Sequence, residues 1–182
     1  MVTLRLATPG DLPALRELIP LSVRALSRGY YTPAQIESAI RHVFGPDTQL
    51  VADGTYFVAE AGGCLAGCGG WSRRRTLYGG DQMKETEDPL LDPATEAARI
   101  RAFFVHPEWA RRGVGSAILR ACTRAAREAG FRSLELMATL PSEPLYRAFG
   151  FEAVERVEST LPDGVVVDFV RMIRRLEYAD GG

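Results

Sequence analysis

The sequence predicts an α/β protein, and three observations support this. Segments with the two-residue alternation of strands take turns with segments whose apolar residues recur at helical spacing. Two pairs of predicted strands are separated only by short turns, at residues 62–63 and 162–164. A predicted strand, a glycine-bearing loop and a predicted helix follow one another across residues 99–130. With 182 residues, we expect one domain over 1–178 and a frayed tail at 179–182.

The first half of the chain alternates strand and helix signals. Thr32 and Gln35 form a capping box with Pro33 at the first helical position, which predicts the start of a helix. Gly62 and Gly63 between two apolar runs predict an antiparallel hairpin. The predicted elements are a strand at 2–7, a helix from Leu12 onward, a helix at 33–43, a short turn through Leu50 and Val51, and strands at 55–61 and 64–71.

The second half begins with a long connection. Residues 73–96 contain two glycines, two prolines and six acidic residues without a sustained period, so we expect a mobile loop there. Regular patterns then return until near the C-terminus. The predicted elements are strands at 99–105, 133–138, 152–161 and 165–176, and helices at 114–129 and 142–149.

The loop before the helix at 114–129 has the chemistry of a phosphate site. Gly113 and Gly115 let a ligand approach the main chain, and free N–H groups at a helix N-terminus attract anions. A Walker loop would need a Gly-Lys pair before Ser116, and this chain has none. A dinucleotide fingerprint would need a third glycine where Ile118 stands, so that interpretation is disfavoured.

Composition narrows the class of partner. The formal net charge of -1 argues against a general nucleic-acid binder, so small molecules are the expected partners. No apolar run approaches the roughly 20 residues that a membrane span needs. Three cysteines and no apolar N-terminal stretch favour a cytoplasmic location. Cys64 and Cys68 have no histidine or further cysteine nearby, so we expect no metal site.

Two stretches together resemble a known family. Residues 102–119, AFFVHPEWARRGVGSAIL, and residues 145–152, LYRAFGFE, are similar to the GCN5-related N-acetyltransferase (GNAT) superfamily. The superfamily's acetyl-CoA motif is Q/R-x-x-G-x-G/A. Its two glycines fall on Gly113 and Gly115, whereas its first position falls on Ala110. This departure leaves the main-chain cradle intact and changes only the side chain beside the pyrophosphate.

The resemblance implies a fold and a cofactor. The fold is a mixed α/β (α+β) GNAT acyl-CoA N-acyltransferase fold, whose mostly antiparallel sheet has about seven strands, one parallel central pair and about four flanking helices. The main chain of the central strand pairs with the pantetheine arm of acetyl-CoA, and the strand after the third helix splays away. The implied cofactor-binding residues are Phe103, Phe104, Val105, Ala110, Arg111, Arg112, Gly113, Val114, Gly115, Ser116 and Tyr146.

The resemblance also suggests catalytic residues. Tyr146 is expected to act as general acid toward the thiolate that leaves the thioester. Glu96, at the head of the central strand, is the first candidate for the base that deprotonates the amine, and Glu135 and Asp81 are alternatives. His106 precedes Pro107, which favours a turn residue over a base.

Other residues are candidates for binding. Tyr30, Tyr31 and Trp71 are expected to form a wall of the substrate site. The run at 73–75, three arginines, is either a site for the 3′-phosphate of coenzyme A or, more simply, a solvated charge run.

The expected activity is transfer of the acetyl group of acetyl-CoA to a primary amine of a small molecule. Two alternatives stay open, namely a non-catalytic acyl-CoA sensor or scaffold and an acyltransferase that uses another acyl group or a protein N-terminus. The sequence leaves the acceptor and the choice between monomer and homodimer undetermined.

Overall fold

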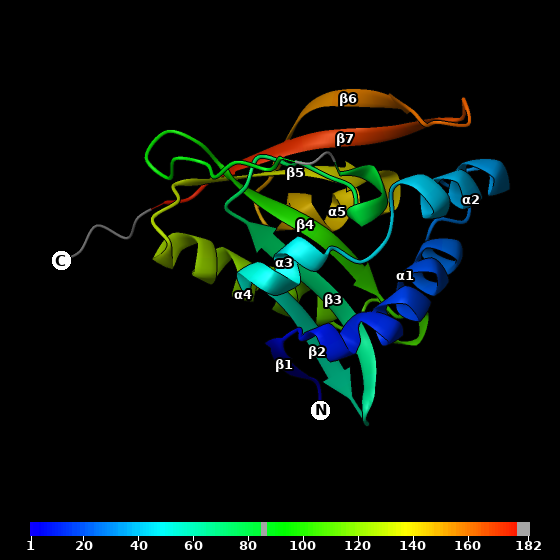
Figure 1. The fold of residues 1–182 in the computed structure, drawn as a ribbon, viewed down its shortest axis with the longest axis horizontal. Coiled ribbons are helices and arrows are strands. Elements are labelled where there is room, and N and C mark those ends of the chain that lie inside the picture. The colour runs from blue at the N-terminus through cyan, green and yellow to red at the C-terminus, as the bar shows by residue number, and fades with distance from the viewer. Residues whose placement is uncertain (85–86, 178–182) are drawn as a thin grey trace.

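A computed structural model describes residues 1–84 and 87–177 of the chain (Figure 1). Within them are seven strands and five α-helices. The strands are β1 (Thr3–Leu6), β2 (Tyr56–Ala61), β3 (Cys64–Ser72), β4 (Ala98–Val105), β5 (Ser133–Thr139), β6 (Glu152–Thr160) and β7 (Val166–Arg175). The helices are α1 (Leu12–Leu26), α2 (Pro33–His42), α3 (Thr48–Asp53), α4 (Val114–Glu128) and α5 (Glu143–Ala148).

The seven strands form one sheet in the order β1-β2-β3-β4-β5-β7-β6. Among the described strands, only β4 and β5 pair in parallel, and each other neighbouring pair is antiparallel. The two predicted hairpins are confirmed as β2–β3 and β6–β7. The mixed, mostly antiparallel sheet with one parallel central pair is therefore confirmed.

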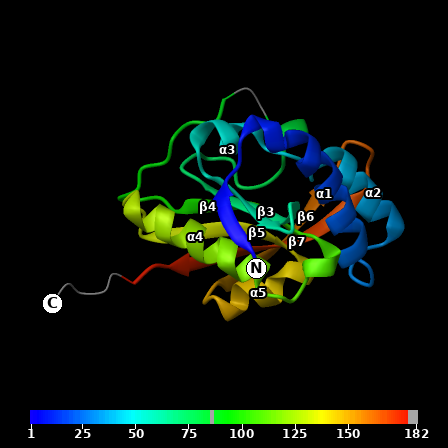
Figure 2. The same ribbon diagram turned by 90° about the horizontal axis from the view of Figure 1, so that it is seen from below.

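Helices cover both faces of the sheet (Figure 2). Side chains of α4 and α5, such as Ile118 and Tyr146, pack in one core on one face. Side chains of α1, α2 and α3, such as Leu15 and Leu50, pack in a second core on the other face. A strand can serve both cores because successive side chains point to opposite faces.

Helix α3 was not predicted. A short turn was expected at Leu50 and Val51, and about four helices were expected in total. The Asp47 side chain caps this helix by accepting a hydrogen bond from the Leu50 N–H at 3.2 Å. Gly54 ends it in the left-handed conformation at a φ of 71°. The helix has only six residues, too few for a clear apolar period, so its pattern did not predict it.

The connection at 73–96 differs from the mobile loop expected from its composition. Its only regular element among the described residues is a 3₁₀ turn at Asp81–Met83. Main-chain hydrogen bonds nevertheless join Leu91 to Arg73 at 2.7 Å and Gly80 to Val43 at 2.8 Å. The described part of the loop is therefore fastened to the fold by contacts distant in sequence. The predicted frayed tail at 179–182 lies outside the described residues.

Candidate active site

Strands β4 and β5 pair only where they begin. The parallel ladder joins Ala98 to Leu134 and Arg99 to Glu135 and extends no further among the described residues. From Ile100 onward, the edge of β4 that faces β5 thus has main-chain groups without a partner strand. Such an edge can pair with an extended, amide-bearing ligand.

A β-bulge turns β4 at this point. Cys68 of β3 pairs with Phe104 and Gly70 pairs with Arg101, so Gly69 alone faces two β4 residues. One of the two, Ala102, has a φ of 57°, in the left-handed region that L-residues seldom adopt. A Cβ on Gly69 would lie 2.7 Å from the Phe103 ring. The bulge therefore depends on a glycine in the neighbouring strand.

After β4, the chain enters the loop that the sequence predicted to bind phosphate. The His106 Nδ1 atom accepts a hydrogen bond from the Glu108 N–H at 3.1 Å, which confirms a turn role for this histidine. Arg111 and Gly113 have positive φ values of 60° and 83°, and Gly113 is the N-cap of α4. The first amides of α4 have no partner within the helix, as at any helix start. These amides belong to Val114, Gly115 and Ser116.

Tyr146 has a buried ring and an uncommitted hydroxyl. Its ring makes edge-to-face contacts with Phe103 at 6.2 Å and Phe151 at 5.7 Å. The hydroxyls of Tyr31 and Tyr56 bond main-chain carbonyls, whereas that of Tyr146 has no hydrogen-bond partner among the described residues. Burial, and secondarily the nearby Cys122, raises the pKa of Tyr146 well above the ordinary tyrosine value.

A pocket lies in the gap between the separated strands and touches both cores. From the side of α4 and α5 it is lined by Phe103 and Tyr146. Thr139 and Ser142 also line it. The Thr139 and Ser142 hydroxyls are 2.8 Å apart. The loop segment 77–80 lines another part of the wall. The candidate acid and the bulged strand thus share one cavity.

Sequence reasoning missed most of the aromatic lining of this pocket. Phe44 follows α2, Tyr78 lies in the 73–96 connection and Phe169 lies on β7, and all three line the cavity with Phe104. Met137 of β5 is also in the wall. No periodic pattern links residues from such distant segments, so only the tertiary structure brings them together.

The three carboxylates proposed as bases lie outside the lining of this pocket. Glu96 accepts a hydrogen bond from the Asp92 N–H at 2.9 Å and lines a separate surface depression at the start of β4. At about 3.3 Å per strand residue, roughly 20 Å separates it from Phe103. Glu135 forms ion pairs with Arg99 at 2.7 Å and Arg171 at 3.0 Å. Asp81 accepts hydrogen bonds from Thr48.

The predicted substrate wall is not assembled around the pocket either. Tyr30 is 54% exposed in the connection between α1 and α2. Tyr31 donates a hydrogen bond to the Asp168 carbonyl at 2.6 Å and accepts one from the Leu140 N–H at 3.0 Å, so its hydroxyl ties that connection to the sheet. Trp71 is buried against Phe131 in the core beneath α4.

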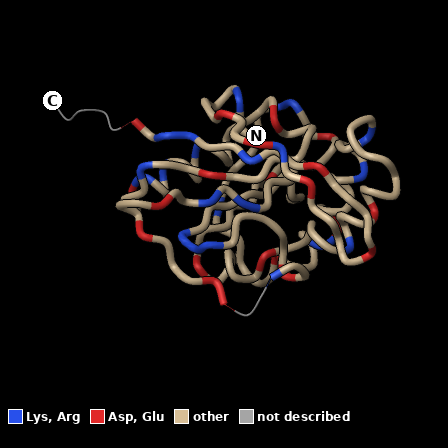
Figure 3. Tube along the Cα trace, turned by 90° about the horizontal axis from the view of Figure 1, so that it is seen from above, with Lys and Arg blue, Asp and Glu red and all other residues tan. Residues whose placement is uncertain are grey.

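The predicted arginines fall into two groups. The run at 73–75 follows β3 at the end of the sheet opposite the loop at 106–113, and Arg74 there forms an ion pair with Asp53 at 2.7 Å. Arg111 and Arg112 lie within the loop, as expected, and Arg112 stacks 5.3 Å over the Trp109 ring. Basic and acidic residues are interspersed along the trace (Figure 3).

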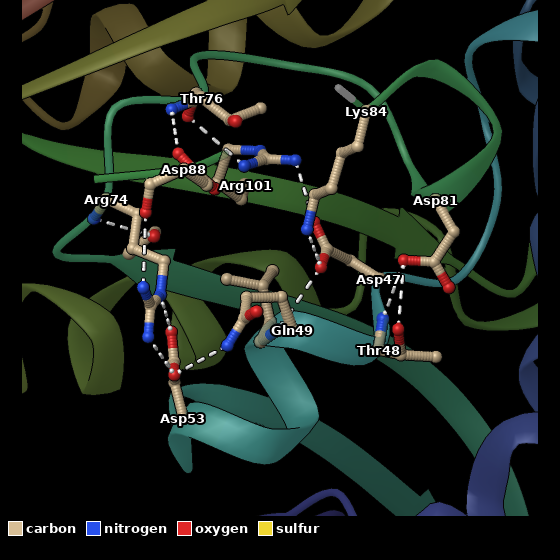
Figure 4. Close-up of polar contacts among 12 residues, drawn as sticks. Asp47, Thr48, Gln49, Asp53, Arg74, Thr76, Asp81, Lys84, Asp88 and Arg101 are labelled. Atoms are coloured by element: carbon tan, nitrogen blue, oxygen red, sulfur yellow. Dashed lines mark hydrogen bonds and ion pairs between the residues drawn. The ribbon is translucent and has the colours of Figure 1, made fainter. Parts of the chain in front are cut away.

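A buried charge network lies behind one wall of the pocket (Figure 4). The Asp47 carboxylate, which has no exposed surface, accepts hydrogen bonds from Arg101 at 2.8 Å and from Lys84. Arg101, on β4, also donates to the carbonyls of Thr76 and Gly79. The network therefore fastens the 73–96 connection to β4 and to the start of α3.

The described residues contain neither a membrane-spanning helix nor a cluster of metal ligands. No helix there is long and apolar enough to cross a membrane. In the same residues, no three His, Cys, Asp or Glu side chains gather closely enough to hold a metal ion. All three cysteines are free, with Cys64 exposed and Cys68 and Cys122 buried.

Parallel strands that separate, a glycine-capped helix and a tyrosine in the pocket between the strands are the features that the resemblance to acyl-CoA-dependent acetyltransferases implied. The model of the acetyltransferase (GNAT) family matches residues 21–151. Since the match covers more than half of the chain, this protein belongs to the GNAT acetyltransferase family. Membership implies an acetyltransferase activity that depends on an acyl-CoA.

Solved structures share the fold over nearly the whole chain. A GCN5-related N-acetyltransferase from Rhodopseudomonas palustris is 19% identical with a TM-score of 0.70, and the match covers 96% of this chain and 95% of that one. YncA, a putative acetyltransferase from Salmonella typhimurium solved with acetyl-CoA, is 17% identical with a TM-score of 0.64. That match covers 100% of this chain and 98% of YncA. A ribosomal-protein-alanine N-acetyltransferase from Brucella melitensis is 20% identical with a TM-score of 0.62, covering 96% and 99%. No curated protein matches the chain significantly.

Proposed function

We propose that this protein transfers the acetyl group of acetyl-CoA directly to a primary amine of a small molecule. One observation carries the proposal. The edge of β4 loses its partner strand where the pocket opens, and the same pocket contains Tyr146. A strand edge for an amide-bearing arm and a proton donor therefore lie in one pocket, and the loop with the phosphate-binding geometry directly follows that strand.

The proposed cofactor site is mostly main chain. The unpaired edge at Phe103, Phe104 and Val105 would receive the pantetheine arm as an added strand. The pyrophosphate would bind the first amides of α4 behind Gly113. Since the amides make these contacts, Ala110 at the first motif position is compatible with binding, and Arg111 and Arg112 add positive charge nearby.

The proposed reaction forms one bond and breaks another at the acetyl carbon. The neutral amine nitrogen adds to the thioester carbonyl, and collapse of the tetrahedral intermediate breaks the carbon–sulfur bond. The Tyr146 hydroxyl donates its proton to the leaving sulfur, and the nitrogen loses a proton to water. The products are an N-acetyl amine and the free thiol of coenzyme A, and solvent restores the proton of Tyr146.

The proposal assigns no base role to Glu96, Glu135 or Asp81. Glu96 lies near the far end of β4, and the other two carboxylates are committed to partners outside the pocket. Two rival functions keep the same cofactor site. A sensor would bind acetyl-CoA without turnover, and a protein acetyltransferase would act on a peptide N-terminus. The Brucella protein is named a ribosomal-protein-alanine N-acetyltransferase, so its name indicates a protein acceptor.

The test is calorimetric titration of the purified protein with acetyl-CoA, coenzyme A and NADH. We expect saturable binding of acetyl-CoA and coenzyme A and no binding of NADH. Thiol release is then followed across small amines and peptides with free N-termini. Lack of acetyl-CoA binding would refute the family function in this chain, whereas binding without thiol release on any acceptor would identify a sensor.

A further inference from the structure

Four aromatic side chains surround the part of the pocket that faces α1 and α2. This aromatic box consists of Phe44, Tyr78, Phe104 and Phe169. Phe44 makes edge-to-face contacts with Phe104 at 5.7 Å and with Phe169 at 6.2 Å between ring centroids. The Tyr78 ring lies 5.5 Å from that of Phe169. Because Phe169 is buried and the other three rings are only half-buried, the box presents apolar surface to the cavity.

The box lies across the separated strands from Tyr146. Tyr146 and Phe103 belong to the core under α4 and α5, whereas the box belongs to the opposite core. If the thioester lies along the edge of β4 beside Tyr146, the second substrate approaches from the opposite face. An acceptor amine that enters from the side of α1 and α2 would meet the box.

The acceptors that this lining offers to an ammonium group are neutral oxygens, such as the Thr139 and Ser142 hydroxyls. No aspartate, glutamate or histidine is among the described residues that line the pocket. Its charged lining residue is Arg101, whose terminal nitrogens already donate to Asp47 and to main-chain carbonyls. The Tyr78 hydroxyl is 3.2 Å from that of Ser159. A dication or polyamine would thus be desolvated here with no carboxylate among the described lining residues to balance its charge.

We propose that the acceptor is a primary amine carried on an aromatic or similarly flat apolar group, and that it reacts as the neutral amine. This inference rests on the proposed acetyl transfer and names its acceptor class. Aromatic rings favour edge-to-face and offset contacts with another ring, which the box supplies from several sides. Desolvation lowers the pKa of a bound amine, so the apolar wall itself favours the nucleophilic form. No side-chain base is then required in the pocket.

The acceptor class is tested first by kinetics of thiol release with the unmodified protein. The panel contains benzylamine, 2-phenylethylamine, spermidine, glutamate and an alanine-terminated peptide. We expect kcat/KM for the arylalkylamines to exceed that of the others by about tenfold or more, a typical discrimination by an apolar pocket. Faster reaction with spermidine, glutamate or the peptide would overturn the inference and leave acetyl transfer intact.

The neutral-amine step is tested by the pH dependence of kcat/KM. Two para-substituted benzylamines, one with methoxy and one with trifluoromethyl, have similar size but different amine basicity. We expect the apparent pKa of each profile to follow the pKa of the amine used. The difference between the two apparent pKa values should therefore equal the difference between the pKa values of the two amines. A single apparent pKa common to both acceptors would instead report an enzyme base and contradict this step.

Variants test the location of the site. Phe44→Ala should raise KM for benzylamine about tenfold while the Kd for acetyl-CoA stays unchanged. Phe44→Leu keeps most of the side-chain volume, so it is less prone to misfold. Its KM for benzylamine should rise less than that of Phe44→Ala. Leu21→Ala, on the exposed side of α1, is the matched control for loss of an apolar side chain. Unchanged KM in a folded Phe44→Ala protein would overturn the assignment, whereas loss of acetyl-CoA binding in the unmodified protein would refute the proposed function instead.

Discussion

At the scale of single residues, the ring and the hydroxyl of Tyr146 have different surroundings. The ring of Tyr146 packs between Phe103 and Phe151, so its position is set by apolar contacts. The hydroxyl makes no hydrogen bond to the described residues, and Tyr146 lines the pocket. Such a group is available to a ligand that enters the pocket.

Tyr146→Phe should lower kcat by about 100-fold, which is typical for loss of one proton donor. The Kd for acetyl-CoA should stay the same because the ring contacts persist. Burial raises the pKa of Tyr146, so the hydroxyl keeps its proton at alkaline pH and no decline in kcat/KM from its ionisation is expected below about pH 10. Stopped-assay rates from pH 6 to 10 measure the fall in kcat and the pH dependence, and calorimetry measures the Kd. An unchanged kcat in Tyr146→Phe would remove the acid role.

At the scale of elements, the start of α4 lies unusually close to β3. A Cβ on Gly67 would lie 2.8 Å from a methyl carbon of Val114 and 3.1 Å from the Phe104 carbonyl oxygen. Gly67 therefore lets the first turn of the helix approach the sheet, and this places the helix amides next to the end of β4. The glycine in β3 therefore shapes the proposed cofactor site through the position of the helix start.

Gly67→Ala should destabilise the protein by about 1–3 kcal/mol, the usual cost of overpacking a core. It should also weaken acetyl-CoA binding, because the displaced helix start misaligns the phosphate-binding amides. Denaturant unfolding and calorimetry measure the two effects. Gly10→Ala is the control, since its Cβ would meet only the Thr8 hydroxyl at an ordinary 3.6 Å. Equal behaviour of the two variants would contradict the close-approach argument.

At the scale of the whole molecule, two polar networks hold together a sheet that opens in the middle. Ion pairs join Arg99 to Glu135, Glu135 to Arg171 and Arg171 to Glu155, and so connect β4, β5, β7 and β6. The Asp47 network connects α3, the 73–96 connection and β4 on the pocket side. Together they support both borders of the gap in which the pocket lies.

Asp47→Asn should destabilise the fold by about 3–5 kcal/mol, because it leaves Arg101 buried without its countercharge. The double variant Asp47→Asn with Arg101→Met should cost less than the sum of the single changes. Chemical denaturation of the four proteins gives this coupling. Asp81→Asn is a control at an exposed carboxylate and should change the stability little. Strict additivity would show that the pair is not energetically coupled.

The contrast between predicted and missed features has a physical basis. Strands, hairpins and most helices were predictable because alternation, capping residues and turn glycines act within a few residues of chain. The helix α3 was missed because its six residues are too few to show an apolar period. The 73–96 connection looked mobile because composition alone does not show the ion pair between Arg74 and Asp53.

The sequence by itself determined the alternation of strands and helices, the two hairpins and the glycine loop at the start of α4, all of which are local consequences of residue type. It also carried the resemblance to the family that the chain belongs to. Only the tertiary structure decided which residues line the pocket. Phe44, Tyr78, Phe104 and Phe169 meet there because long-range packing, with no repeating signal in the chain, brings four separate segments to one opening in the sheet.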